Sequence, residues 1–151
     1  IDYIQCTAET LARNIEVEDS AVANIRWKNG AIGSFSVTML TYDRNLEGSI
    51  TILGEKGSVK ISGTFLNELD HWNFEDSQSP SLDIKKLQSI SMTNFQKQVS
   101  HKSVYENIIK DLKGEETKNI TYGNEALKSL EMIIGMYESS KEGVKKYFPI
   151  R

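Results

Sequence analysis

The stretch Ala21-Val-Ala-Asn-Ile-Arg-Trp-Lys-Asn-Gly-Ala-Ile-Gly-Ser-Phe-Ser-Val-Thr-Met39 decides the fold class of this chain. Apolar and polar residues alternate with a period of two on both sides of Asn29-Gly30, so every second side chain shares a face. An Asn-Gly pair between two alternating runs is the strongest short-range signal of a β-hairpin, because both turn positions need positive φ. We therefore predict two antiparallel strands joined at Asn29-Gly30.

A second hairpin is predicted downstream, where Ser49–Leu53 and Ser58–Ser62 flank Gly54-Glu55-Lys56-Gly57. The two glycines supply the backbone angles of a turn, and the charged pair between them suits a solvent-exposed tip. Residues 73–100 are rich in Ser, Gln, Asp and Lys, and we interpret them as a long surface loop with one edge strand; a ligand-facing segment is the alternative. Further strands are predicted at Tyr3–Ala8, Gly63–Trp72 and Tyr147–Ile150.

The last third of the chain changes to the helical period. Ser100 is a suitable cap and Gly114 a suitable stop for a first helix, and Gly143 follows a second helix over Asn124–Ser140. Strands first and helices last are typical of an α+β domain, so we predict an open, mostly antiparallel sheet with helices packed on one face. The apolar stripe of the first helix is Val104, Ile108, Ile109 and Leu112, and that of the second is Leu127, Leu130, Ile134 and Tyr137.

Composition restricts the class of protein. The chain has 151 residues, 38% of them hydrophobic, and we predict a single domain over residues 1–151. Its 18 basic and 21 acidic residues give a net charge of −3, which offers no electrostatic reason to expect nucleic acid or an anionic membrane as a partner. No apolar run approaches the roughly 20 residues of a membrane span, so we predict a soluble cytoplasmic protein. The chain begins at Ile1 without an initiator Met, and we interpret it as a piece of a longer polypeptide.

The motifs exclude several kinds of self-contained chemistry. The ten glycines never form the G-x-G-x-x-G of a dinucleotide site or the G-x-x-x-x-G-K-[ST] of a P-loop. No G-x-S-x-G motif occurs, and Cys6 lies in a predicted strand, where an inert buried thiol is expected. One cysteine with only His71 and His101 beside it cannot build a tetrahedral Cys/His zinc site. The motifs therefore indicate neither a P-loop, a dinucleotide fingerprint or a tetrahedral zinc site nor self-contained hydrolase chemistry, and we assign no residue of the chain to catalysis, a cofactor or a metal.

The densest group of polar side chains, Tyr42, Arg44, Asn45 and Glu47, lies between the two hairpins. Arg44 could fork onto a carboxylate or phosphate, while Asn45 and Glu47 could bond to hydroxyl groups, which suits a carbohydrate or an acidic sugar. An ordinary polar connection between strands is the alternative.

His101 falls in the first turn of a predicted helix. The helix dipole disfavours the imidazolium there and leaves a neutral ring that can bond to a ligand. The alternative is a solvent-facing histidine next to a cap, and for His71 a surface position is favoured more strongly still.

Three stretches resemble the C-terminal domain of the glucose–fructose oxidoreductase / inositol dehydrogenase (Gfo/Idh/MocA) family. They are Val17–Ala23 leading through Asn29-Gly-Ala31, then Asn45–Ile61, and His101–Ser140. The middle stretch is most similar to the branch that oxidises UDP-N-acetyl-glucosaminuronate at C3 in polysaccharide biosynthesis. The branch usually has Pro-Lys where this chain has Asp43-Arg44, so an anion would meet a guanidinium here.

The resemblance implies a role as the substrate-binding and oligomerisation domain of an NAD(P)-dependent sugar dehydrogenase. Family members carry an N-terminal Rossmann domain that holds NAD(P), with the sugar between the two domains and the open sheet face packed against another subunit. The resemblance implies that Tyr42, Arg44, Asn45, Glu47 and His101 face the substrate. The family's Glu-Lys-Pro motif lies in the Rossmann half; Glu55-Lys56, which Gly57 follows at a hairpin tip, is not that motif.

Two functions are consistent with these observations. In the first, the chain is the C-terminal part of a sugar oxidoreductase, inactive and unable to bind NAD(P) by itself, that contributes sugar contacts and self-associates through the open sheet. In the second, it is a stand-alone module for protein association or ligand binding, without catalysis. We expect self-association in either case, because single domains rarely leave a large apolar patch in water.

Overall fold

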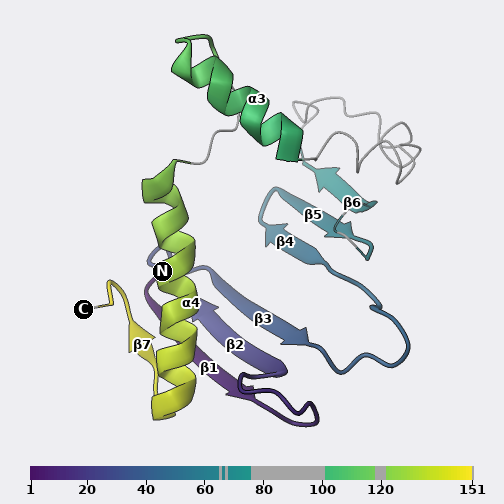
Figure 1. The fold of residues 1–151 in the computed structure, drawn as a ribbon, viewed down its shortest axis with the longest axis vertical. Helices are drawn as coiled ribbons and strands as arrows, with labels where there is room; N and C mark the ends of the chain where they lie inside the picture. Colours follow the sequence, from purple (N-terminus) through teal and green to yellow (C-terminus); the bar gives the residue numbers. More distant parts are fainter. Residues whose placement is uncertain (65, 67, 76–100, 118–121, 151) are drawn as a thin grey trace. The chain divides into compact units, whose positions relative to one another are not determined.

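The structure is a computed structural model that describes residues 1–64, 66, 68–75, 101–117 and 122–150, without the side chains of residues 101–103. The chain divides into two compact units, Ile1–Tyr42 with Thr121–Arg151, and Asp43–Ile120. Both contain antiparallel strands and a helix, which confirms the predicted α+β class (Figure 1). None of the described helices is long and apolar enough to cross a membrane.

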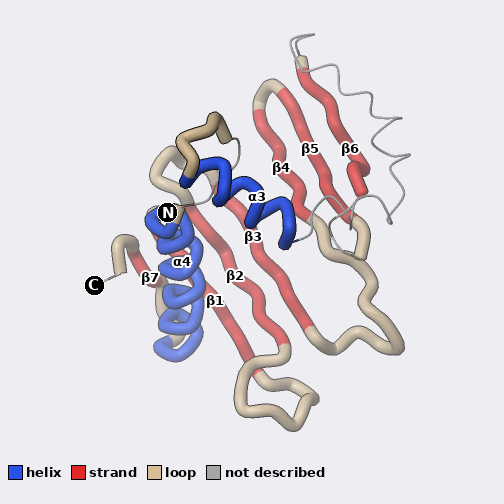
Figure 2. Tube along the Cα trace, turned by 45° about the horizontal axis from the view of Figure 1, so that its top comes forward, coloured by secondary structure: helices blue, strands red, loops and turns tan. Residues whose placement is uncertain are grey.

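The first unit is a four-stranded antiparallel sheet with one helix against it (Figures 1 and 2). The sheet order is β3-β2-β1-β7, and α4 lies against β1. The strands predicted between residues 3 and 39 and the second predicted helix are confirmed to within a few residues, whereas the terminal strand lies at Lys146–Tyr147 and shares only Tyr147 with the predicted Tyr147–Ile150. The elements are β1 (Tyr3–Glu9), β2 (Ser20–Arg26), β3 (Ile32–Thr38), α4 (Gly123–Glu142) and β7 (Lys146–Tyr147).

The hairpin of β2 and β3 turns where the sequence predicts, but with a different geometry. Gly30 has φ of 91°, whereas Asn29 does not take a positive φ, so the expectation that both turn positions need one was wrong. The N–H of Gly30 donates to the carbonyl of Trp27, and the N–H of Trp27 donates to the carbonyl of Ala31, both at 2.9 Å. This longer loop places a single glycine in the left-handed region, as in a type I turn followed by a bulge.

Helix α4 packs on the sheet through a face other than the predicted stripe. Leu127, Leu130, Ile134 and Tyr137 are all exposed, while Gly135, Met136 and Ser139 are buried. Gly135 leaves room for the ring of Phe148, which a Cβ would meet at 2.6 Å. The interpretation of the larger apolar stripe as core-facing was wrong, because close approach favours the small residues of the opposite side.

The core consists of Ile4, Cys6, Ala23, Ile25 and Met136. β7 pairs only with Tyr3 and Ile4, so it leaves the rest of that edge of β1 without a strand. Hydroxyl groups of α4 replace the missing strand: Ser139 Oγ accepts from the N–H of Cys6 at 2.9 Å and Ser140 Oγ from that of Ala8 at 2.8 Å. These bonds fix the helix against the sheet, since buried backbone N–H groups require partners.

The second unit contains a three-stranded antiparallel sheet in the order β4-β5-β6, and the helix α3 (His101–Leu112). Its strands are β4 (Ile50–Gly54), β5 (Gly57–Ser62) and β6 (Glu68–Phe74), so the second predicted hairpin is confirmed and the third strand begins later than predicted. Gly114, with φ of 73°, follows the helix as expected. Ser100 and most of the predicted surface loop lie outside the described residues.

Candidate functional site

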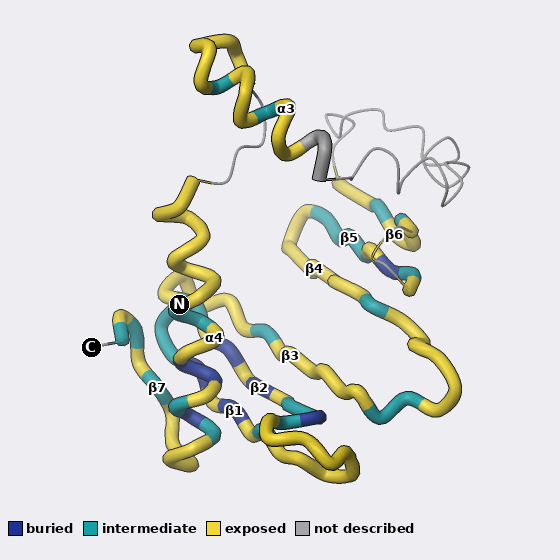
Figure 3. Tube along the Cα trace, in the orientation of Figure 1, coloured by how far each residue is buried: buried dark blue, intermediate teal, exposed yellow. Residues whose placement is uncertain are grey.

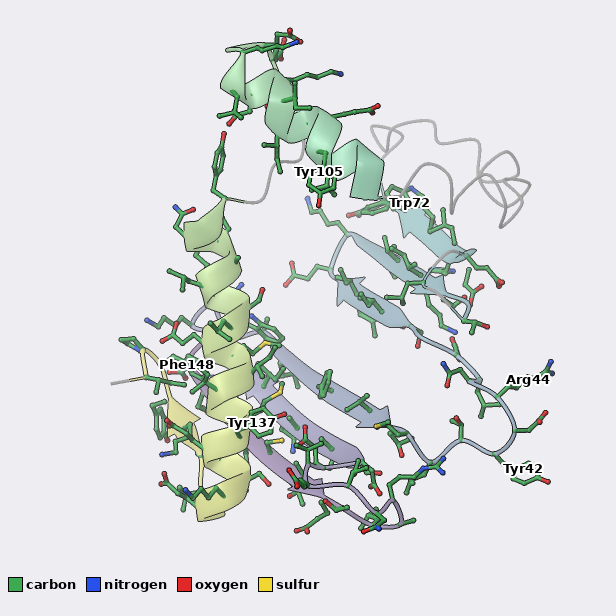
Figure 4. The ribbon with its side chains drawn as sticks, in the orientation of Figure 1. Tyr42, Arg44, Trp72, Tyr105, Tyr137 and Phe148 are labelled. Atoms are coloured by element: carbon green, nitrogen blue, oxygen red, sulfur yellow. The ribbon has the colours of Figure 1, made fainter. Side chains whose placement is uncertain are left out.

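The predicted ligand-binding segment is the connection between β3 and β4. Tyr42 has 95% of its surface exposed, and Arg44 and Asn45 are exposed as well. Their side chains make no hydrogen bond or ion pair with any residue that the structure describes, and Figure 4 shows Tyr42 and Arg44 extending away from the backbone. Asp43 adopts φ of 66°, a conformation that Asp tolerates better than most residues. These residues are accessible, and the structure places each on the surface.

Glu47, the last residue of the predicted set, is held by the sheet of the second unit. Lys60 Nζ lies 3.2 Å from Glu47 Oε1. The backbone next to Glu47 is also fixed, because the N–H of Gly48 donates to the carbonyl of Gly63 at 2.9 Å. Of the four residues in the segment, Glu47 is the one whose position the described structure determines.

A β-bulge brings a second carboxylate to Lys60. The register of β5 and β6 shifts between Lys60 and Ile61, so Lys60 pairs with His71 and Ile61 with Leu69. This irregularity places Asp70, which would otherwise point to the opposite face, with Oδ2 at 3.1 Å from Lys60 Nζ. Lys60, Glu47 and Asp70 therefore form one ionic network on one face of the sheet.

Hydrogen bonds within the network shift the pKa values of two of its members. Hydrogen bonds from Ser62 and then Lys60 lower the pKa of the Asp70 carboxyl. Hydrogen bonds to Asp70 and Glu47 raise the pKa of the Lys60 ammonium. Both shifts favour the charged forms, so Lys60 and Asp70 are ionised at neutral pH.

A serine–histidine contact lies on the same face. Ser58 Oγ is 2.7 Å from His71 Nε2, and His71 is the cross-strand partner of Lys60. The sequence interpretation treated His71 as a surface histidine and did not use Lys60, Ser58 or Asp70. One signal could have found part of this group, because Ser58, Lys60 and Ser62 alternate along one predicted strand.

His101 begins α3, in agreement with the predicted position at a helix start. Its side chain is outside the described part of the structure, as is its predicted cap Ser100. A contact between His101 and a ligand stays a prediction.

We searched the described residues for a dinucleotide site and for a metal site. Both sheets are antiparallel and no described helix connects two parallel strands, so the strand–helix turn that cradles a dinucleotide is not among them. The residues present therefore do not fit NAD(P), and we assign none of them to it. No group of three His, Cys, Asp or Glu side chains in the described part is arranged to hold a metal ion. Cys6 is buried as expected, and burial raises the pKa of its thiol.

The open face of the first sheet, on the side away from α4, carries mainly polar side chains. A shallow hollow of about 560 Å³ lies there, lined in part by Tyr3, Gln5, Asn24, Ser34 and Lys145. Lys145 Nζ lies 4.6 Å from the centre of the Tyr3 ring. This face is mainly polar because the alternation that builds the core sends Ser, Thr, Asn and Gln to the other side, and self-association through it stays a prediction.

Almost the whole chain matches one family of known proteins. Residues 3–148 match the "oxidoreductase family, C-terminal alpha/beta domain" of the Gfo/Idh/MocA proteins. No curated protein matches the chain.

Two solved structures are similar to nearly the whole chain. The WlbA dehydrogenase of Chromobacterium violaceum, in complex with NADH and UDP-GlcNAcA, is 45% identical with a TM-score of 0.86, and the match covers 99% of this chain and 41% of that one. The WlbA dehydrogenase of Bordetella pertussis, with the same two ligands, is 40% identical with a TM-score of 0.88, covering 99% and 42%. The chain thus spans about two fifths of the length of these proteins.

More distant structures share the fold alone. Levoglucosan dehydrogenase in complex with NADH and levoglucosan is 16% identical, with a TM-score of 0.70 over 99% of this chain and 45% of that one.

Proposed function

Because the chain belongs to the Gfo/Idh/MocA oxidoreductase family as its C-terminal domain, we propose that it is the substrate-side domain of an NAD(P)-dependent dehydrogenase of nucleotide sugars or sugar acids. The observation that carries the proposal is the identity of 40–45% over 99% of the chain to two dehydrogenases whose structures hold NADH and UDP-GlcNAcA. The cofactor would be bound by a nucleotide-binding domain outside these residues.

The accessible polar segment supports an acidic sugar as the ligand. The guanidinium of Arg44 is exposed and can form two parallel hydrogen bonds to a carboxylate or a phosphate. Tyr42 and Asn45 offer groups for sugar hydroxyls, and Glu47 offers a carboxylate oxygen. The part of these residues, together with His101, is to bind and orient the sugar. NAD(P), held by another domain, would supply the acceptor for a hydride from a sugar carbon, and a base would have to take the hydroxyl proton.

The test uses the complete reading frame to which these residues belong. We expect the purified product to reduce NAD(P)⁺ when a UDP-linked sugar acid is added, followed by the absorbance of the reduced nicotinamide. Arg44→Ala should raise KM for the sugar about tenfold and leave KM for the dinucleotide unchanged, because it removes a charge-assisted contact to one ligand only. Lys56→Ala, at the hairpin tip, is the matched control.

The 151-residue chain by itself should neither oxidise the sugar nor bind NADH. Saturable NADH binding in a calorimetric titration would contradict the assignment of the cofactor to another domain.

We also propose that the chain self-associates through the open face of the first sheet, in the dehydrogenase or as a stand-alone module. The observation that favours this is the exposure of Val22 and Ile32 among polar groups on one face of the sheet, a mixture typical of interfaces. Sedimentation equilibrium should show at least a dimer, and Val22→Lys should shift the protein toward monomer. A monomer at high concentration would argue against the interface.

A further inference from the structure

Glu47 differs from its neighbours in the ligand-binding segment because its orientation is set before any ligand arrives. Lys60 holds one oxygen of its carboxylate, and the hydrogen bond between Gly48 and Gly63 holds its backbone. Tyr42, Arg44 and Asn45 have no such support from the described residues. A ligand that bonds to Glu47 therefore loses less side-chain entropy than one that must order the group itself.

We propose that Lys60 is a positioning residue, which orients the Glu47 carboxylate to accept a hydrogen bond from a hydroxyl group of the sugar, and that Asp70 holds Lys60 in place. The inference rests on the proposed function, in which the Tyr42–Glu47 segment binds the sugar. It adds two residues, from β5 and β6, that the segment itself does not contain.

The two carboxylate oxygens of Glu47 differ in their contacts. Lys60 Nζ approaches Oε1, and Oε2 has no partner among the described residues. The ammonium has three donors, of which one faces Glu47 and one faces Asp70 at 3.1 Å. An ionised carboxylate only accepts hydrogen bonds, so Oε2 selects a ligand group that donates, such as a sugar hydroxyl.

The network is poorly suited to a role in stability alone. The side chains of Lys60, Glu47 and Asp70 are 36%, 46% and 41% exposed. Ion pairs with this exposure contribute little to the free energy of folding, because water screens them and ordering long side chains costs entropy. A binding site, by contrast, requires supporting residues that hold the ligand-contacting side chains in a fixed orientation.

The elements behind Lys60 make the orientation rigid. Lys60 lies on β5, the central strand of its sheet, with strand partners on both sides. Asp70 reaches it through the β-bulge of β6, and the hydrogen bond of Asp70 with the buried Ser62 ties the carboxylate to β5. The lysine is thus restrained by the sheet, independently of the connection that carries Glu47.

The inference is tested with five variants of the complete protein: Lys60→Met, Lys60→Arg, Glu47→Gln, the double variant Lys60→Met/Glu47→Gln, and the control Lys56→Met. KM for the UDP-linked sugar acid is measured for each by the absorbance of the reduced nicotinamide. We expect Lys60→Met to raise KM about fivefold and Glu47→Gln about tenfold, typical of one hydrogen bond to a charged group. Lys60→Arg should restore most of the loss, and Lys56→Met should behave like the wild type.

The double variant separates positioning from a direct or structural role. If Lys60 acts through Glu47, Lys60→Met changes KM less than twofold in the Glu47→Gln background. An equal fivefold rise in both backgrounds would overturn the inference and leave the proposed function intact. So would an unchanged KM in Lys60→Met. If the wild type does not turn over any UDP-linked sugar, the proposed function is wrong and the inference falls with it. Should Lys60→Met fail to fold, KM is compared instead for Asp70→Asn in the wild-type and Glu47→Gln backgrounds, because Asp70 holds Lys60.

Discussion

In the first unit, five apolar residues of β1, β2 and α4 form a buried cluster, whereas Ser62 is the only buried residue among the described residues of the second unit (Figure 3). Both sheets expose some apolar side chains, such as Ile32 in the first and Ile52 in the second, but the second also carries an ionic network on one face. The two units therefore differ in what their side chains contribute. Among the described residues, the first unit buries the apolar cluster that stabilises the fold, and the second leaves most of its apolar and charged side chains in contact with solvent.

The comparison is tested most severely by removing equal side-chain volume from each unit. Ile4 is fully buried and Ile52 is 64% exposed. We expect Ile4→Ala to lower the free energy of unfolding by about 3 kcal/mol, because it removes buried surface and leaves a cavity. Ile52→Ala should lower it by less than about 1 kcal/mol. Urea denaturation followed by circular dichroism measures both, and similar losses in the two variants would contradict the comparison.

A smaller effect is expected where α4 meets the C-terminal residues. A Cβ on Gly135 would lie 2.6 Å from Phe148 Cζ and 3.0 Å from Ile150 Cδ1. Gly135→Ala should therefore lower the free energy of unfolding by about 1–2 kcal/mol, despite the higher helix propensity of alanine. Gly123→Ala, in the same helix with no atom within 4 Å of the added Cβ, should instead stabilise the protein by about 0.5 kcal/mol. If both variants gain stability, the close approach is not as tight as described.

The loop between β1 and β2 offers a test that depends on pH. The Asp19 carboxylate accepts backbone hydrogen bonds from Leu11, Ala12 and Arg13, which lower its pKa to about 2. Because the pKa is lower in the folded state, the carboxylate stabilises the fold fully above about pH 4, and this contribution disappears as the pH falls through about 2.

Asp19→Asn should accordingly lower the melting temperature by about 5 °C at pH 6. Its difference from the wild type should shrink as the pH falls through about 2, because the Asp19 carboxylate is protonated over that range and becomes neutral like the amide. Calorimetry over this range measures the difference, and a gap that does not change with pH would show that the charge of Asp19 is not the cause.

The smallest effect is expected in the ionic network of the second unit. Lys60→Met should change the melting temperature by no more than about 2 °C, because the pairs with Glu47 and Asp70 are exposed to water. Differential scanning fluorimetry is sufficient for this measurement. A loss comparable to that of Ile4→Ala would mean that the network holds the second unit together, and it would weaken the assignment of Lys60 to sugar positioning.

Much of the secondary structure is predictable from local signals. The alternation around Asn29-Gly30 predicts β2 and β3, and Gly143 marks the end of α4, where its φ of 68° closes the helix. The face of α4 is not predictable in the same way. Counting large apolar residues favours Leu130 and Ile134, while the packed face depends on which side chains are small enough to let the helix approach the sheet.

The candidate site, too, is only partly predictable from the sequence. Tyr42, Arg44, Asn45 and Glu47 stand out as a dense polar segment, since their spacing is visible in the chain itself. The lysine behind Glu47 is not visible there, because its position depends on the pairing of β5 with β6 and on one shifted residue in that pairing.

The amino-acid sequence alone determined the α+β class, the two hairpins, the helix ends and the family resemblance. These features follow from backbone preferences and periodicities that act over a few residues. The tertiary structure alone decided which side of α4 faces β1 and which cation holds Glu47. Both depend on atoms far apart in the chain, and their distances are set only when strand register and side-chain volume are satisfied together.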